Sequence, residues 1–109
     1  MIRDFGHRAE SMGLDSIWMG EHVAFFDKNT YGYPGSKDGR IPAPPGGGML
    51  DVTATFGFLA AATTKVRLGT GVALVPQRNP IYTAKEMCTL DWLSDGRIDF
   101  GIGVGWNKE

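Results

Sequence analysis

A glutamate and a histidine stand side by side at the end of a short apolar segment. Glu21 and His22 directly follow residues 15–20, DSIWMG, which read as a buried β-strand. The pKa of an imidazole lies near neutrality, so a histidine at a strand end can act as a general acid or base, or hydrogen-bond a cofactor ring. The alternative is a histidine that only caps the strand or lies in a loop, and both interpretations of His22 stay open.

Two glycines interrupt the next apolar run, residues 66–80, which has the sequence VRLGTGVALVPQRNP. Glycine weakens a strand interior and usually marks a bulge or the close approach of another group. In one interpretation, Gly71-Val72 lets the backbone bulge toward a planar cofactor. In the other, Gly69 and Gly71 only allow a helix to pack tightly on the strand. The residues alone favour neither.

A third group of glycines ends the last apolar segment. Residues 101–105, GIGVG, have the spacing G-x-G-x-G and not the G-x-G-x-x-G of dinucleotide-binding folds, which disfavours an NAD-dependent dehydrogenase. The run either exposes backbone amides at a strand end or fills a crowded interior. Trp106 follows it, at a strand end where a ligand can lie. His7 and His22 are far apart in the chain, and no carboxylate spacing completes a metal site.

Four further side chains have mainly structural interpretations. Arg78 precedes the start of a predicted helix and pairs either with a phosphate or carboxylate, or with solvent. Asp91 and Arg97 flank a tight turn and are interpreted as an ion pair. Cys88 lies in an amphipathic helix and is interpreted as a small core residue. As the only cysteine it excludes an internal disulfide and suits a reducing cytoplasm.

The elements that must position these residues alternate between helix and strand. Asp51 and Asn79 are good N-caps, so two of the helices have defined starts. Helices are predicted over residues 3–12, 52–63 and 80–93, and strands over 15–20, 66–74 and 97–102. Residues 23–49 have no periodicity and contain many prolines and glycines, so they are predicted as a long loop of the kind that often binds ligands.

Apolar stripes predict which helix faces are buried. A spacing of three or four residues brings side chains onto one face of a helix. The stripe of the first helix comprises Phe5, Ala9 and Met12, and that of the second comprises Val52, Phe56, Leu59 and Thr63.

This order predicts the α/β class with a parallel sheet, because near-continuous apolar strands alternate with helices. Residues 1–109 are taken as a single domain, since no linker divides them. Three parallel strands close a core poorly and a complete barrel needs about 250 residues, so the pattern predicts a piece of a larger α/β barrel. The net charge of −1 gives no case for nucleic acid, and no apolar run approaches the ~18 residues that span a membrane.

Three ordered blocks of the chain resemble a known family. They read AESMGLDSIWMGEHV, LAAATTKVRLGTGVALVPQRNP and AKEMCTLDWLSDGRIDFGIGVGWNKE, and they cover nearly the whole sequence. They are similar to the luciferase-like monooxygenase superfamily, and most similar to its branch that uses the deazaflavin coenzyme F420. The resemblance implies a partial (β/α)8 TIM barrel, comprising about strands two to four with the helices between them.

The resemblance also implies roles for particular residues. The cofactor is expected at the C-terminal ends of the strands, where His22 contacts its ring and takes part in proton transfer. Glu21 stands where many F420-using members have Asp and flavin-using luciferases have Glu. Gly71-Val72 matches a bulge with a non-prolyl cis peptide that supports the ring. Leu74 and Val75 are expected to line the pocket.

The implied activity is that of an oxidoreductase. It would transfer a hydride, or insert oxygen into a small-molecule substrate, with coenzyme F420 or alternatively reduced FMN, and homo-oligomers are compatible with it. The first barrel strand would precede residue 1 and strands five to eight would follow residue 109, so the chain alone is expected to bind cofactor poorly. The rival hypothesis is a non-catalytic half-barrel module that assembles with a second chain. Neither hypothesis involves nucleic acid or membrane.

Overall fold

Helices and parallel strands alternate along the chain, as the sequence pattern predicts. The structure, a computed structural model, describes residues 1–25, 32–41 and 48–106. The loop expected over residues 23–49 therefore lies only partly within the described residues. The elements are α1 (Ile2–Ser11), β1 (Ser16–Met19), α2 (Val52–Ala62), β2 (Arg67–Thr70), β3 (Ala73–Leu74), the 3₁₀ helix η1 (Val75–Gln77), α3 (Pro80–Leu93), β4 (Ile98–Asp99) and β5 (Ile102–Gly103).

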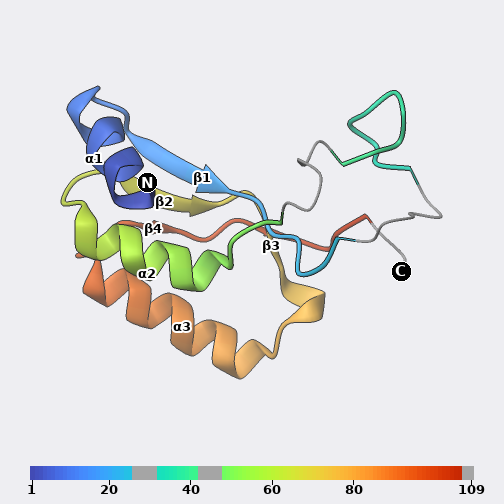
Figure 1. The fold of residues 1–109 in the computed structure, drawn as a ribbon. Helices are drawn as coiled ribbons and strands as arrows, with labels where there is room; N and C mark the ends of the chain where they lie inside the picture. Colours follow the sequence, from blue (N-terminus) through green and yellow to red (C-terminus); the bar gives the residue numbers. More distant parts are fainter. Residues whose placement is uncertain (26–31, 42–47, 107–109) are drawn as a thin grey trace.

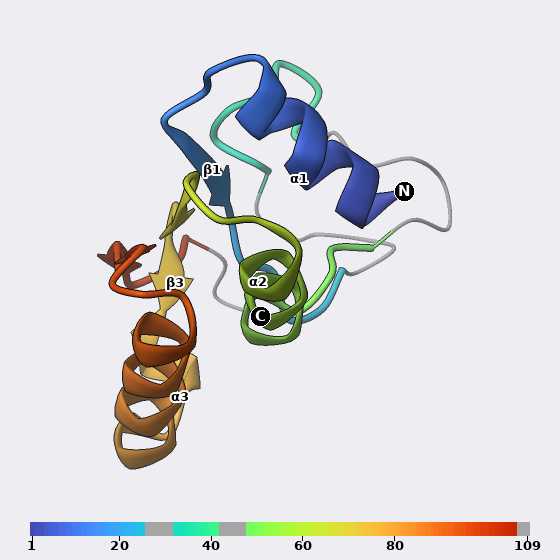
Figure 2. The same ribbon diagram turned by 90° about the vertical axis from the view of Figure 1, so that its left-hand side faces the viewer.

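The strands form two small parallel sheets. The first has the order β1-β2-β4, and its register aligns Ile17 with Leu68 and Leu68 with Ile98. The second pairs β3 with β5 and aligns Ala73 with Ile102. All strands run in one direction and the helices lie on one face of them, with α2 between α1 and α3 (Figures 1 and 2). This is the expected α/β arrangement.

Two of the three expected strands are broken, and the breaks lie side by side. The strand predicted over residues 66–74 divides into β2 and β3, and the strand predicted over 97–102 divides into β4 and β5. The carbonyl oxygen of Gly101 joins the two breaks, because it accepts hydrogen bonds from the Thr70 hydroxyl at 2.7 Å and the Ala73 amide at 2.9 Å. The chain therefore leaves one sheet and enters the other without losing its direction.

Side-chain caps begin two of the helices at the expected residues. Asp51 accepts a hydrogen bond from the Ala54 amide at 2.7 Å, and Asn79 accepts from the Ile81 and Tyr82 amides at 3.0 and 3.2 Å. Such caps satisfy amides that have no partner within the helix. None of the described helices is long and apolar enough to cross a membrane.

The core lies between α2 and the sheet. The predicted α2 stripe is buried along its whole length, and Phe56 and Leu68 have no exposed surface. The predicted stripe of α1 is confirmed only for Ala9, which is buried, and is wrong for Phe5 and Met12, which are exposed. Helix α1 instead approaches α2 through Gly6, where a Cβ would lie 2.9 Å from Thr63 Cγ2. An approach this close leaves no room for a large side chain, so the helix presents its small residues.

Arg97 does not pair with Asp91, contrary to expectation. Its guanidinium is buried, and it donates five hydrogen bonds to backbone and hydroxyl oxygens of Ala60, Thr63, Val66 and Ser94. Two of the acceptors are carbonyls at the C-terminal end of α2, where the helix dipole favours a cation. Asp91 accepts from the Ile98 amide at 3.3 Å instead.

Cys88 is exposed, so its interpretation as a core residue is wrong as well. Its helix, α3, buries Thr83, Met87 and Leu90. These three positions are spaced by four and three residues and define a face that leaves position 88 outside it.

Gly69 is required by packing within the sheet. A Cβ at this position would lie 2.5 Å from the indole ring of Trp18. That ring is held in place by a hydrogen bond that Trp18 Nε1 donates to Ser16 Oγ, with the two atoms 2.8 Å apart. The tight packing that the sequence allowed for Gly69 is therefore present, but it is against a neighbouring strand and not a helix.

This contact predicts a coupled pair of substitutions. Gly69→Ala should lower the free energy of unfolding by about 1–3 kcal/mol, because the methyl group overlaps the indole ring. Trp18→Ala in the same chain should recover most of that loss, and urea unfolding of both single variants and the double variant measures the coupling. Additive losses would show that the indole ring moves aside without cost.

Candidate active site

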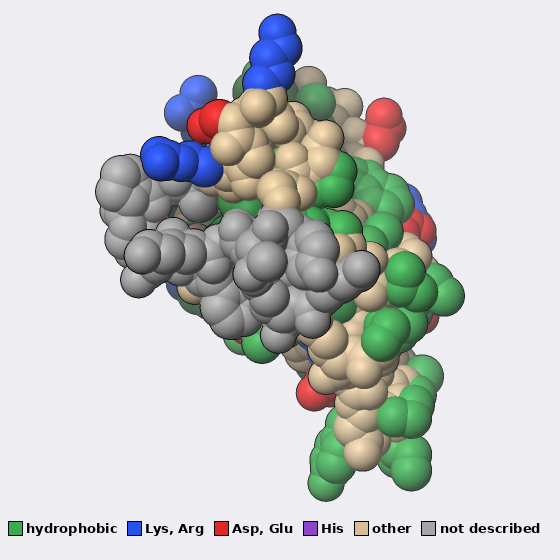
Figure 3. Space-filling view, turned by 90° about the vertical axis from the view of Figure 1, so that its right-hand side faces the viewer, with side chains coloured by type: hydrophobic (Ala, Val, Ile, Leu, Met, Phe, Trp, Pro, Cys, Tyr) green, Lys and Arg blue, Asp and Glu red, His purple; other side chains and the backbone are tan. Residues whose placement is uncertain are grey.

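A cleft opens where the strands end. It has a volume of about 680 Å³. The described strands point toward this end of the molecule in Figure 1, and Figure 3 faces it. Open α/β folds and barrels place their ligands at this end. Its lining comprises Gly20, Glu21, His22, Val23, Ala24, Tyr33, Met49, Gly71, Val72, Leu74, Gln77, Gly105 and Trp106.

His22 lies in this cleft among aromatic rings. The centroid of its ring is 5.4 Å from that of Phe25 and 6.5 Å from that of Trp106. Tyr33 packs edge-on against Trp106, with ring centroids 5.4 Å apart and an interplanar angle of 72°. Trp106 was expected at a strand end where a ligand can lie, and it is there. Sequence reasoning missed Tyr33, because the loop that carries it has no periodic pattern.

Glu21 lines the cleft, but its carboxylate is already engaged. Both carboxylate oxygens accept from Arg78, with Nε at 3.0 and 3.1 Å and an additional contact from Nη2, and Oε2 accepts from the Leu74 amide at 2.7 Å. Burial acts to raise the pKa of Glu21, but these hydrogen bonds and the charge of Arg78 outweigh it, so the pKa lies below its ordinary value. Glu21 therefore stays ionised and ties the end of β1 to β3.

Arg78 pairs with carboxylates, which was one of its two open interpretations. Besides Glu21, it donates from Nη1 to Glu86 Oε2 at 3.2 Å. The side chains of Arg78 and Glu21 are only 15% and 7% exposed, whereas that of Glu86 is 39% exposed. The pair with Glu21 is thus the shielded one, and it joins β1 to the segment that leads into α3.

Gly71-Val72 forms the floor of the cleft. The peptide bond between them is cis, as the family resemblance implied. The Gly71 amide donates to the Met19 carbonyl at 2.7 Å, which holds this segment beside β1. A Cβ at Gly71 would meet only one atom, Trp18 Cε3 at 3.6 Å, so packing does not require glycine there. Of the two interpretations, crowding fits Gly69 and an open approach fits Gly71.

The later glycines have a structural reason. A Cβ at Gly101 would overlap the Thr70 carbonyl oxygen, and one at Gly103 would overlap Val72 Cγ2. The crowded-interior interpretation is confirmed for both. Leu74 is buried and lines the cleft, whereas Val75 begins η1 and is not among the lining residues. Within the described part of the chain, no three His, Cys, Asp or Glu side chains are grouped closely enough to hold a metal ion.

Residues 1–109 match the model of a single protein family, described as luciferase-like monooxygenase. The chain belongs to that family. Among its relatives, an uncharacterized protein of Mycobacterium tuberculosis is 37% identical over 93% of this chain. An F420-dependent glucose-6-phosphate dehydrogenase of Kineococcus radiotolerans is 32% identical over 95% of it.

A solved structure shares the fold. The oxygenating constituent of 3,6-diketocamphane monooxygenase from Pseudomonas putida, in complex with FMN, superposes on 96% of this chain with a TM-score of 0.68 and 21% identity. The fold is accordingly part of a luciferase-like (β/α)8 TIM barrel. The chain spans 36% of the M. tuberculosis relative, 26% of the dehydrogenase and 24% of the solved chain.

Proposed function

We propose that this chain forms one side of the cofactor cleft of an oxidoreductase that works with coenzyme F420, or alternatively with reduced FMN. The observation that carries the proposal is the convergence of His22 and Gly71-Val72, from the ends of β1 and β2, on one cleft. When bound, such a cofactor supplies a hydride, or reducing equivalents for oxygen insertion.

The residues present fit a flat, largely apolar ring. The backbone at Gly71 is open to the cleft, so it can lie against a ring without interference from a side chain. Leu74 and Val72 add apolar surface, and His22 offers a nitrogen that can hold or move a proton at the ring. Glu21 would position the floor of the cleft through its hydrogen bond from the Leu74 amide.

Different observations favour F420 and FMN as the cofactor. A relative at 32% identity is named for its dependence on F420, whereas a solved structure with the same fold holds FMN. Glu21 matches the residue of flavin-using luciferases. The proposed cofactor is F420, with reduced FMN as the alternative.

Titration of the ¹⁵N-labelled chain with F420 and with FMN tests the proposal. The amides of Gly20, His22, Gly71 and Gly105 should shift, with a Kd on the order of 0.1–1 mM, because an open cleft buries only part of the ligand. Micromolar binding would contradict the expected weakness of the chain alone. Shifts confined to other parts of the chain would overturn the proposed site.

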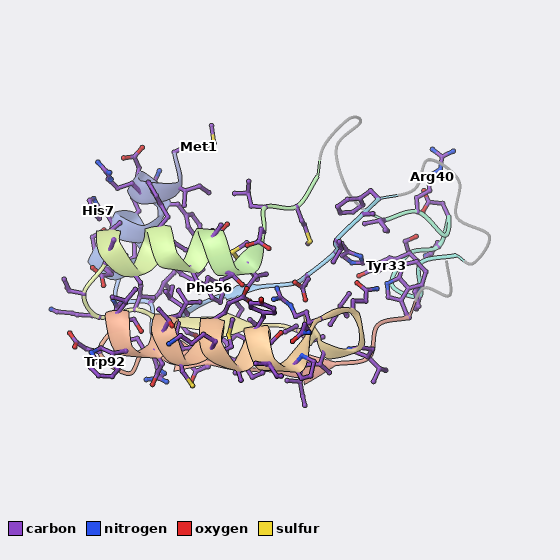
Figure 4. All side chains as sticks on the ribbon, turned by 90° about the horizontal axis from the view of Figure 1, so that it is seen from below. Met1, His7, Tyr33, Arg40, Phe56 and Trp92 are labelled. Atoms are coloured by element: carbon purple, nitrogen blue, oxygen red, sulfur yellow. The ribbon has the colours of Figure 1, made fainter. Side chains whose placement is uncertain are left out.

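A histidine pair provides the matched control. His22→Ala should weaken cofactor binding by about threefold to tenfold, whereas His7→Ala should leave it unchanged, because His7 is exposed on α1, away from the cleft (Figure 4). Equal effects of the two substitutions would exclude a specific contact by His22.

A second candidate function has its own observation. Several large apolar side chains are exposed, including Ile81, Trp92 and Val104 at 78–86%. Exposed apolar surface of this kind favours association, so the chain could act as a non-catalytic module that assembles with another copy or a second chain. Size-exclusion chromatography with and without cofactor separates the two: a stable oligomer that binds neither cofactor supports the module.

A further inference from the structure

Aromatic rings from three distant segments meet at the mouth of the cleft. His22 and Phe25 follow β1, Tyr33 lies in the described loop segment 32–41, and Trp106 follows β5. We call these four residues the aromatic cluster; His22, Tyr33 and Trp106 line the cleft, and Phe25 contacts His22. Tilted and edge-on contacts between such rings are favourable, so the cluster forms a coherent wall. Figure 4 shows Tyr33 beyond the strand ends, on the side of the molecule away from Trp92.

The wall is largely aromatic, and the His22 imidazole is the one basic group among the described lining residues. The only carboxylate among them, that of Glu21, is neutralised by Arg78. No lysine or arginine is among those residues, and Met49 and Val72 extend the apolar surface. A phosphate or carboxylate placed against this wall would lose its hydration without gaining the permanent cation that a lysine or arginine supplies.

Three members of the cluster carry polar atoms: the His22 imidazole, the Tyr33 hydroxyl and the Trp106 indole nitrogen. Trp106 Nε1 is buried and has no hydrogen-bond partner among the described residues. A buried donor without an acceptor is unfavourable, so a rotation of the indole ring that brings Nε1 to a ligand oxygen gains a hydrogen bond. This donor distinguishes the wall from a purely hydrophobic surface.

We propose that the aromatic cluster is the substrate subsite of the cleft. Its substrate is an uncharged aromatic or apolar molecule with a carbonyl or hydroxyl oxygen for Trp106 Nε1. The proposal rests on the proposed function, because it concerns the same cleft. It separates this protein from its relative named glucose-6-phosphate dehydrogenase, whose named substrate carries a phosphate.

Benzyl alcohol and benzyl phosphate are matched probes for the test. They share a ring and differ by the phosphate, and both are added to the cofactor-free ¹⁵N-labelled chain. The three tryptophans give three indole N–H signals. Benzyl alcohol should shift the indole signal of Trp106 and not that of Trp92. Benzyl phosphate should bind at least about tenfold more weakly than benzyl alcohol. Binding of benzyl phosphate at equal or greater strength would overturn the proposal.

Substitutions locate the binding. Trp106→Ala should weaken the binding of benzyl alcohol by about tenfold, and Tyr33→Ala should weaken it by about threefold, because each substitution removes one ring of the wall. Trp92→Ala is the matched control and should have no effect, since Trp92 is 86% exposed on α3. Tyr33→Ala keeps the test decisive if Trp106→Ala unfolds, and unchanged affinity in it would contradict the subsite.

Cofactor titration makes the two failures distinguishable. If F420 or FMN shifts Gly71 but benzyl alcohol does not shift Trp106, the substrate subsite is wrong and the proposed function stands. If benzyl alcohol binds the cluster and neither cofactor binds, the proposed function fails.

Discussion

Arg97→Met should remove at least about 3 kcal/mol from the free energy of unfolding, the largest effect expected of any single substitution considered. The guanidinium is buried and supplies five hydrogen bonds to oxygens of Ala60, Thr63, Val66 and Ser94. Methionine has similar length and no donors, so these acceptors lose their partners at once. Urea unfolding followed by circular dichroism at constant pH measures the loss.

Two further substitutions show whether the loss of stability comes from the missing hydrogen bonds of Arg97. Arg97→Lys should recover only part of the stability, since an ammonium cannot reproduce the planar fork of donors. Arg40→Met should change the unfolding free energy by less than about 0.5 kcal/mol, because Arg40 is exposed (Figure 4). A fully stable Arg97→Lys variant would show that charge at the end of α2 matters and the hydrogen-bond geometry does not.

Glu21→Gln should lower the free energy of unfolding by about 2 kcal/mol, and it should also weaken cofactor binding. The side-chain amide of the variant would still accept a hydrogen bond from the Leu74 amide, but Arg78 would lose the shielded carboxylate that its guanidinium contacts. The segment from Gly71-Val72 to η1 would then be held less firmly beside β1. Chemical unfolding and the F420 titration report the two effects separately.

The contribution of Glu21 to stability should depend on pH. Its pKa is lower in the folded protein than its ordinary value of 4.5, so its contribution is present above about pH 4.5 and is lost as pH falls through the folded pKa. Glu10 and Asp99 also have lowered pKa values. Burial opposes the shift of Glu10, but hydrogen bonds from the Thr64, Lys65 and Val66 amides outweigh it, and Arg67 lowers that of Asp99. The variant should therefore lose less stability on acidification than the wild type, but some acid sensitivity should remain.

Glu86→Gln is the matched control for this prediction. Glu86 contacts Arg78 once, at 3.2 Å, and is 39% exposed, so its ion pair is weakened by solvent. Its substitution should cost much less than that of Glu21. Equal losses would mean that Arg78 needs any second carboxylate and not the one at the end of β1.

Local signals in the sequence predicted much of the fold. Asp51 and Asn79 mark helix starts by chemistry that involves neighbouring residues only, and the spacing of the α2 stripe follows from helix geometry. The burial of Arg97 and the exposure of Phe5 depend on how closely α1, α2 and the sheet approach one another. No local pattern encodes those distances, so both expectations were wrong.

The site divides in the same way. The position of His22 at a strand end, and of Gly71-Val72 beside it, followed from the alternation of elements and from the family resemblance. The bond between Glu21 and Arg78 joins residues 57 apart in the chain, and Tyr33 reaches Trp106 from a loop without periodicity. Contacts of this kind are set by tertiary structure alone.

The interruption at Thr70 and Gly101 divides residues 67–74 into β2 and β3, and residues 98–103 into β4 and β5. The two parts of each segment have different roles. The first halves, β2 and β4, belong to the sheet that the buried core and Arg97 support. The cleft residues that these two strands and their ends contribute lie in and around β3 and after β5, beside those that follow β1. Along each strand, stability and ligand choice therefore depend on separate stretches of sequence. A new substrate can be accommodated by changes beyond the break, while the residues before it continue to hold the protein together.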